Sequence, residues 1–303
     1  MKEKNFISAV IYIRNNEEII KENLKLIYNT LNDNFEKFEI ICVNDASNDN
    51  SIKQIKETTA NFENGVASII NMSYYQGTEL SINAGVDLAI GDFIYEFDTI
   101  DIDYNIDEIF KIYQTSLEGN DIVLLSPTKN NIFSKMFYYL FNKFSKNMYT
   151  IGTERLKVIS RRAVNRINTL SKTIPYRKAL YSNCGLKLKQ IKYSPTKKVE
   201  TFKSNDLAID SLVMFTDIGY KATLYISVIM MAISVIMLIY ILIIYFGKNS
   251  PIEGWTTTML FLSFNFFILF ILITIVIKYL SIILSLTFRK QKYLIESIEK
   301  ITK

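Results

Sequence analysis

The sequence predicts an α/β protein with a mainly parallel sheet, followed by helices that contact or cross a membrane. Over residues 1–128, apolar strand-like runs alternate with helical patterns at the spacing of βαβ units. Polar residues follow three of these runs, at the edge of a parallel sheet where ligands collect. Farther along, the runs 222–246 and 255–277 contain no charged residue, and each is long enough to cross about 30 Å of hydrocarbon.

The elements of the α/β region follow in chain order. The run FISAVIYI is apolar and rich in β-formers, and the segment after it places Ile20, Leu24, Ile27 and Leu31 at helical spacing. The same alternation then repeats along the region. The predicted strands are 6–13, 38–45, 66–72 and 92–98, and the predicted helices are 14–31, 52–62, 77–90 and 107–114.

Composition limits the classes of function. A net charge of +5 over 303 residues argues too weakly for a nucleic-acid partner, but it suits contact with an anionic lipid surface. The chain has no histidine, which removes the hydrolase mechanisms that use imidazole as a base. Cys42 and Cys184 lie in ordinary contexts that fit reduced cytosolic thiols.

The C-terminal part predicts a hairpin of two transmembrane helices, the alternative being two buried helices of a soluble core. The short turn between the two runs has one basic residue, Lys248, whereas several basic residues flank the hairpin on both sides. Both termini are therefore expected in the cytoplasm. The stretch 130–149 mixes aromatics with lysines, as an interfacial helix or an ordinary surface helix does, and its place before the spans favours the membrane surface. After the second span, the chain is expected to continue as a helix that returns to the soluble domain.

These patterns divide the chain into four predicted parts. An α/β core is followed by a region with interfacial helices, then by the transmembrane hairpin and an amphipathic cytoplasmic tail. Their bounds are 1–128, 129–221, 222–288 and 289–303.

Three carboxylates are crowded into FIYEFDTIDIDYN, residues 93–105. Asp98, Asp101 and Asp103 would repel one another unless a cation lay between them. Hard Mg²⁺ or Mn²⁺ prefers such oxygen ligands, so these residues are the candidate metal and catalytic group. The alternative is a set of solvated loop acids in which Asp103 or Asp107 caps the following helix.

Several segments resemble family 2 glycosyltransferases. VNDASNDNS (43–51) resembles their nucleotide-sugar loop, and residues 77–98 resemble the helix and strand that lead to their metal motif. The segments 133–145, 156–168 and 254–298 are similar to the membrane-anchored branch that acts on polyprenyl phosphates, which includes bactoprenol glucosyltransferases and dolichol-phosphate mannosyltransferase. The resemblance covers nearly the whole chain.

The resemblance implies a GT-A (Rossmann-like) domain and an inverting enzyme of a bacterial cytoplasmic membrane, working on a cell-envelope glycan. Its donor would be a nucleotide sugar, with a UDP-sugar expected, and its acceptor would be polyprenyl (undecaprenyl) phosphate. Its cofactor would be Mg²⁺ or Mn²⁺, and it would assemble as a homo-oligomer such as a tetramer. An anionic acceptor phosphate needs no general base. The alternative is a catalytically degenerate relative that serves as a binding or assembly partner, because Ile100 stands where the family's second metal aspartate belongs.

The resemblance also assigns roles to individual residues. Several of these residues also have an ordinary structural alternative. Asp45 could form an Asx turn or cap a helix, Arg161 could pair with surface acids, and the lysines among them could attract an anionic lipid surface in general. Lys157 stands where the family usually has arginine. The implied nucleotide-sugar residues are Tyr12, Arg14, Asn15, Asp45, Gln76, Gly77 and Asp98, and the implied acceptor-phosphate or diphosphate residues are Arg161, Arg177, Lys197, Lys198 and Lys203.

Overall fold

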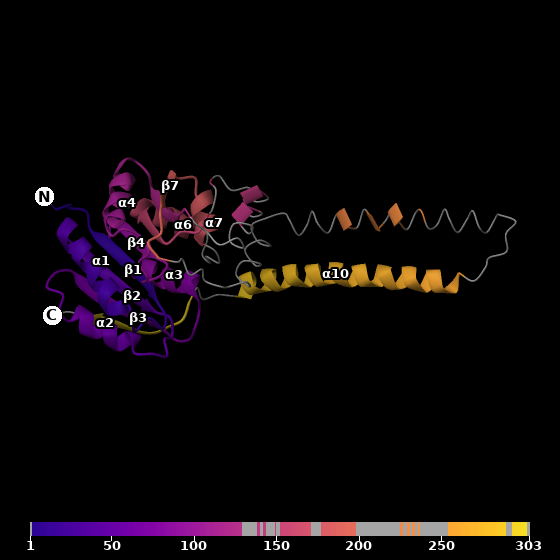
Figure 1. Ribbon diagram of the computed structural model, residues 1–303, viewed down its shortest axis with the longest axis horizontal. Helices are drawn as coiled ribbons and strands as arrows, with labels where there is room; N and C mark the ends of the chain where they lie inside the picture. The colour runs from indigo at the N-terminus through magenta and orange to yellow at the C-terminus, as the bar shows by residue number, and fades with distance from the viewer. Residues whose placement is uncertain are drawn as a thin grey trace. The chain divides into compact units, whose positions relative to one another are not determined.

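The computed structural model describes residues 2–128, 138, 139, 142, 143, 149, 152–170, 177–197, 225, 226, 229, 230, 232, 233, 236, 254–288 and 293–301. The chain divides into two compact units. The first consists of Met1–Asn142, Asn147–Lys203 and Lys290–Lys303 and holds the sheet (Figure 1). The second consists of Lys143–Lys146 and Ser204–Arg289 and holds helix α10.

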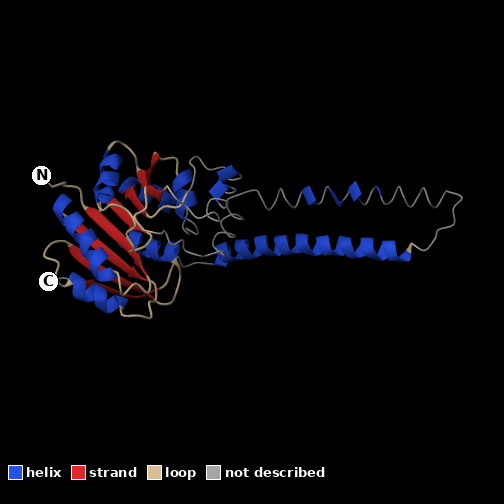
Figure 2. Cartoon of the chain, in the orientation of Figure 1, coloured by secondary structure: helices blue, strands red, loops and turns tan. Residues whose placement is uncertain are grey.

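The first unit is built on an eight-stranded mixed sheet with the order β7-β5-β6-β4-β1-β2-β3-β8 (Figure 2). Neighbours β1/β2, β2/β3, β1/β4 and β5/β7 are parallel, whereas β6 and β8 run antiparallel to the strands beside them. The predicted α/β class with a mainly parallel sheet is therefore confirmed. The strands are β1 (Ile7–Ile13), β2 (Phe38–Asn44), β3 (Val66–Met72), β4 (Phe93–Phe97), β5 (Ile122–Pro127), β6 (Leu156–Ser160), β7 (Leu188–Tyr193) and β8 (Ile295–Ile301).

Helices cover both faces of the sheet, and successive strand residues point to opposite faces. Ile11 and Ile13 of β1 pack with α1, α2 and α4, whereas Val10 and Tyr12 pack with α3, α6 and α7. The strands are thus buried on both sides, which explains why they read as continuous apolar runs. The helices are α1 (Ile20–Asn34), α2 (Ser51–Thr59), α3 (Thr78–Leu88), α4 (Asp107–Leu117), α6 (Arg161–Leu170) and α7 (Arg177–Asn183).

The four predicted strands and the four predicted helices of the first 128 residues are confirmed, with shifted ends. The largest shift is at α1, which begins at Ile20 and not at Arg14. Residues 14–19 instead form the loop at the carboxyl end of β1, and they bond to the loop that follows β2. Helical propensity in that stretch yields to tertiary hydrogen bonds.

The tail is a strand and not the predicted helix. β8 pairs antiparallel with β3, and its residues alternate between partly buried and exposed. Asn71 of β3 donates to Ser297 Oγ at 3.0 Å and to Glu299 Oε1 at 3.2 Å. Without β8, β3 would present an unpaired edge, so backbone pairing decides the conformation of this segment. The predicted return of the tail to the α/β domain is confirmed.

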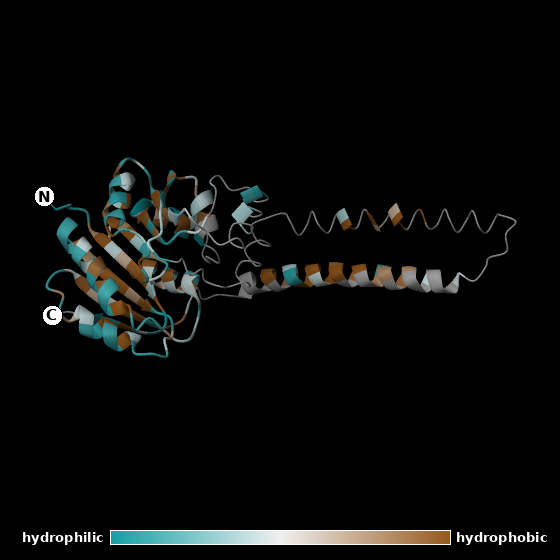
Figure 3. Cartoon of the chain, viewed as in Figure 1, coloured by the Kyte–Doolittle hydropathy of each residue, from teal (hydrophilic) through white to brown (hydrophobic). Residues whose placement is uncertain are grey.

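The second unit is represented mainly by α10 (Trp255–Phe288), a helix of 34 residues. Figure 3 shows apolar residues along this helix and on the strands of the first unit, with hydrophilic residues on α1 and α2. Among the residues that the structure describes, no helix combines the length and apolar character needed to cross a membrane. Most of the predicted run 222–246, most of the predicted interfacial helix 130–149 and the turn 247–253 lie outside the described residues.

Candidate active site

The loops at the carboxyl ends of β1 and β2 are joined by hydrogen bonds. Asn48 N donates to Asn15 Oδ1 at 2.9 Å, and Asn15 N donates to Ser47 Oγ at 3.1 Å. Arg14 Nη1 donates to the Asp45 carbonyl oxygen at 2.7 Å, and this bond holds the guanidinium group at this edge of the sheet. Further bonds join Asn16 to Ser51, Glu17 to Asp49, and Asn50 to Glu17. Such a preformed edge suits a ligand held by polar loops.

Asp45 holds a third loop, the one that follows β3, through hydrogen bonds. Its side chain is fully buried, and its carboxylate accepts from Tyr12 Oη at 3.0 Å, Gln76 N at 2.8 Å and Gly77 N at 2.9 Å. Burial, and then the neighbouring Asp45 carboxylate, raise the pKa of Tyr12, so its hydroxyl remains a donor. Gly77, at the point where these amides meet Asp45, has a φ of 86°, a backbone conformation that glycine adopts without steric cost. Asp45, Tyr12, Gln76 and Gly77 are therefore brought together, with Asp45 supporting the loop.

The loop residues after β3 also contact the first loop and the tail. The Arg14 guanidinium lies 3.8 Å from the centre of the exposed Tyr75 ring, a cation–π contact. Gln76 Nε2 donates to Leu294 O at 2.6 Å, and Leu294 N donates back to Gln76 Oε1 at 2.9 Å. The predicted residues Arg14, Asn15 and Gln76 thus lie on adjoining loops of one edge.

Replacing Asp45 with asparagine is expected to lower the free energy of unfolding by about 1–3 kcal/mol, because a buried amide group would face the Gly77 N–H. Chemical denaturation measures this loss, and Tyr12→Phe, which removes one of the three bonds, should cost about 1 kcal/mol. Unchanged stability together with lost nucleotide binding would instead identify Asp45 as a direct ligand of the nucleotide.

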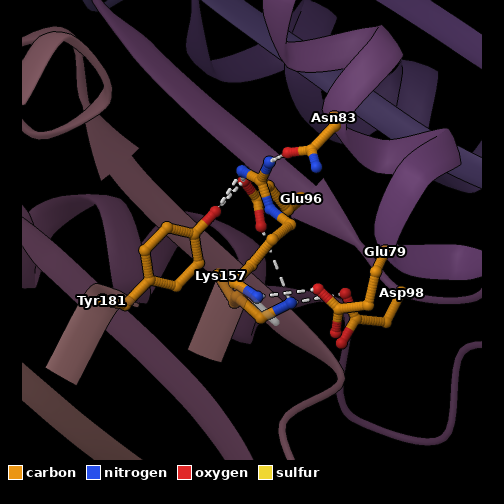
Figure 4. Close-up of polar contacts among 7 residues, drawn as sticks. Glu79, Asn83, Glu96, Asp98, Lys157 and Tyr181 are labelled. Atoms are coloured by element: carbon orange, nitrogen blue, oxygen red, sulfur yellow. Dashed lines mark hydrogen bonds and ion pairs between the residues drawn. The ribbon is translucent and has the colours of Figure 1, made fainter. Parts of the chain in front are cut away.

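Beside this edge, a second group of polar side chains, some buried and some partly buried, comes from β4, β6, α3 and α7 (Figure 4). Glu96 and Asp98 lie two residues apart at the end of β4, on the face that packs against α3 and α7. Lys157 is directly opposite Glu96 in the antiparallel β4/β6 register. Its Nζ lies 3.6 Å from Glu96 Oε2 and donates a short hydrogen bond to Asp98 Oδ1.

Arg177 at the start of α7 completes this network. Its guanidinium forms short bonds with Glu96, Asn83 and the Tyr181 hydroxyl, and its backbone N donates to Glu79 Oε2 at 3.0 Å. Burial lowers the pKa of Arg177, but the Glu96 carboxylate, Tyr181 and Glu79 outweigh it and hold that pKa above its ordinary value. Arg177 is thus a buried cation held by Glu96, and the acceptor-binding role that the resemblance implied for it stays a prediction.

The three aspartates predicted to share a metal each have a separate basic partner. Asp98 pairs with Lys157, Asp101 lies 3.9 Å from the exposed Lys197, and Asp103 lies 3.6 Å from Arg155. Asp103 also accepts from Tyr193 Oη at 2.6 Å and is almost fully buried. Ile100, between Asp98 and Asp101, is fully buried in the core.

This donor set does not fit a divalent ion, which needs several oxygens around one point. Within the described part of the chain, no three Asp, Glu, Cys or His side chains gather to form such a site. The aspartates stay apart because buried Ile100 and Ile102 draw the intervening backbone into the core.

Of the remaining predicted residues, Arg161 and Lys197 are described, and neither contacts the network around Glu96. Arg161 donates to the carbonyl oxygens of Ala89 and Gly91, which precede β4. Because β6 is antiparallel to β4, a residue that follows β6 falls at the edge opposite Asp98. Lys197 is exposed and near Asp101, whereas Lys198 and Lys203 lie outside the described residues.

Glu96 is the functional candidate that sequence reasoning missed. It is a fully buried acid within FIYEF, an otherwise apolar strand, and a buried charge of that kind requires a partner. The strand pattern could have identified Glu96, but its partners come from β6 and α7. The same reasoning missed Glu79, Asn83 and Tyr181 and gave Lys157 no role.

A hollow of about 370 Å³ lies where the ends of β2 and β3 meet β8. It is lined by Asn44 and Asn71 and by Glu296 and Glu299 of the tail. Glu299 also pairs with Lys56 at 2.6 Å. Two carboxylates make the hollow unfavourable for a diphosphate, so an anionic ligand is better placed near Arg14.

The sequence matches the family described as Glycosyl transferase family 2 over residues 8–167. It is 25% identical over 279 residues to a Bacillus subtilis (strain 168) protein named Uncharacterized glycosyltransferase YkcC, with 88% of this chain and 85% of that protein covered. It is 31% identical over 153 residues to the Undecaprenyl-phosphate 4-deoxy-4-formamido-L-arabinose transferase of Proteus mirabilis (strain HI4320), which covers 50% of this chain and 45% of that protein.

Among solved structures, the fold is similar to mannosyltransferase PcManGT from Pyrobaculum calidifontis, determined with GDP-Man and Mn²⁺. The TM-score is 0.53 at 13% sequence identity, and the match covers 70% of this chain and 63% of that chain, less than two thirds of it. At this identity the likeness concerns the fold alone, which is the GT-A (Rossmann-like) α/β fold.

Proposed function

Because the chain belongs to glycosyl transferase family 2 and is a glycosyltransferase, we propose that it moves a sugar from a nucleotide-diphosphate donor to polyprenyl phosphate. The donor of this proposal is a UDP-sugar and the acceptor is undecaprenyl phosphate. The observation that carries the proposal is the preformed polar edge, where the loops after β1, β2 and β3 are tied together around Asp45 and Arg14. The named activity of the Proteus mirabilis relative supports the choice of acceptor.

The chemistry is a single displacement at the anomeric carbon. An oxygen of the acceptor phosphate forms the new bond as the bond from that carbon to the donor's β-phosphate oxygen breaks, so configuration inverts. The acceptor is already an anion, so the step needs no proton transfer, and the nucleoside diphosphate leaves with the electron pair. Arg14 is the cation at the open edge, and it is suited to bind the diphosphate because a guanidinium can donate two parallel bonds.

Membrane anchoring belongs to this proposal and rests on the uncharged runs 222–246 and 255–277 of the sequence. Anchored there, the α/β unit would meet a lipid-borne phosphate at the cytoplasmic surface of a bacterial inner membrane. Assembly as a homo-oligomer is the corresponding expectation for the quaternary structure.

The test is transfer of label from UDP-sugars to lipid. Inverted membrane vesicles that contain the full chain should form a labelled lipid from one of UDP-glucose, UDP-galactose or UDP-N-acetylglucosamine when undecaprenyl phosphate is added. Sealed right-side-out vesicles should not form the labelled lipid. Arg14→Met is expected to slow transfer by about tenfold or more, since a charged contact to the leaving diphosphate is lost.

Arg162→Met is the matched control. Arg162 is an exposed cation 3.6 Å from Asp121, so its loss should leave transfer unchanged. Equal transfer by wild-type and Arg14→Met vesicles would contradict the role of Arg14, and no labelled lipid with any donor would contradict the proposed acceptor.

A further inference from the structure

The end of β4 already holds a cation that belongs to the chain. Lys157 is almost fully buried, and its Nζ lies between the carboxylates of Glu96 and Asp98 (Figure 4). Strand periodicity puts both acids on one face, and the antiparallel register puts Lys157 on the same face opposite Glu96. The position is therefore set by backbone pairing and does not depend on a flexible loop.

An ammonium group at this point competes with a divalent ion for Asp98. One carboxylate oxygen is already bonded to Lys157, and a second positive charge a few ångströms away would be repelled. Asp101 and Asp103 offer no compensation, because they pair with Lys197 and Arg155. Arg177 neutralises Glu96 from the other side, so Lys157 is not required for Glu96 alone.

We propose that Lys157 serves as the cation of this site, so that donor binding does not require a divalent metal ion. Lys157 neutralises Asp98, the carboxylate that would otherwise repel the donor diphosphate at the end of β4. It acts through Asp98 and is a positioning residue. This inference rests on the proposed function for the identity of the donor, whereas its claim about metal binding does not.

Manganese binding tests the inference directly. The full chain in detergent is titrated with Mn²⁺, and electron paramagnetic resonance measures the free ion, first without nucleotide and then with UDP. Wild type and Lys157→Arg are expected to bind Mn²⁺ only weakly. Lys157→Met frees Asp98 and should bind Mn²⁺ about 10- to 100-fold more tightly, the size of effect seen when groups next to a metal ligand are changed.

The double variant Lys157→Met/Asp98→Asn is the matched control. It removes both members of the pair and leaves no uncompensated charge. If Lys157→Met alone does not fold, UDP binding by wild type in EDTA, described below, still tests the inference. The double variant should bind Mn²⁺ as weakly as wild type. A gain of metal affinity that depends on Asp98 cannot come from a merely structural role of Lys157.

Calorimetry of UDP binding gives a second measurement. Wild type should bind UDP with the same affinity in EDTA and in Mn²⁺, within about twofold, whereas Lys157→Met should need Mn²⁺. The inference is overturned if wild type binds Mn²⁺ as tightly as Lys157→Met, or if EDTA abolishes UDP binding by wild type. If UDP does not bind under any condition, the proposed donor is wrong, and the Mn²⁺ titration without nucleotide still decides the role of Lys157.

Discussion

Replacing Arg177 with methionine is expected to lower the free energy of unfolding by about 3–5 kcal/mol, because it leaves the charge of Glu96 buried without its main partner. Both side chains are almost inaccessible, and the bond between them is reinforced by Tyr181, whose hydroxyl donates to Glu96 Oε1 at 2.5 Å. Methionine fills much of the volume of arginine, so the loss reports charge more than packing. Equilibrium denaturation of the α/β unit within the full chain measures it.

The double variant Arg177→Met/Glu96→Gln is the control for this prediction. With the buried acid neutralised as well, most of the lost stability should return, and the cycle should give a coupling energy of about 1 kcal/mol or more. The role in acceptor binding that the family resemblance implied for Arg177 would give a different result. In that case Arg177→Met would cost less than about 1 kcal/mol while transfer to the lipid phosphate fell strongly.

Replacing Asp103 with alanine is expected to cost about 2–4 kcal/mol, because it leaves the Arg155 guanidinium without its carboxylate and Tyr193 without its acceptor. Burial, and then the bond to Asp103, raise the pKa of Tyr193, so its hydroxyl stays protonated and would be left as an unsatisfied donor. Thermal denaturation should show the loss, while transfer per folded molecule should change little.

Asp101→Ala is the matched control, because it removes a neighbouring aspartate that is only loosely paired with Lys197. Its cost should be about 0.5 kcal/mol or less. Similar losses of transfer in both variants, with stability unchanged, would show that the two aspartates act together as the predicted metal ligands.

The sequence was sufficient to predict the first four strands and the helices between them. A strand buried on both faces must be a continuous apolar run, and FISAVIYI and FEIICVN are such runs. It was insufficient for β8, because IESIEKI has a pattern that suits either a helix or an edge strand. The unpaired edge of β3, which is far away in the sequence, decides between them.

For the residues of the site, too, the sequence was sufficient for one aspect and insufficient for another. The sequence by itself determined which polar side chains follow β1, β2 and β4, because strand ends can be found from local apolar patterns. Only the tertiary structure decided what those side chains contact. Asp45 meets the amides of Gln76 and Gly77, and Asp98 meets Lys157, which is 59 residues farther along the chain. The physical reason is that a strand's own residues fix which way a side chain points, whereas its partner is set by the register of the neighbouring strand, which depends on how the whole chain packs.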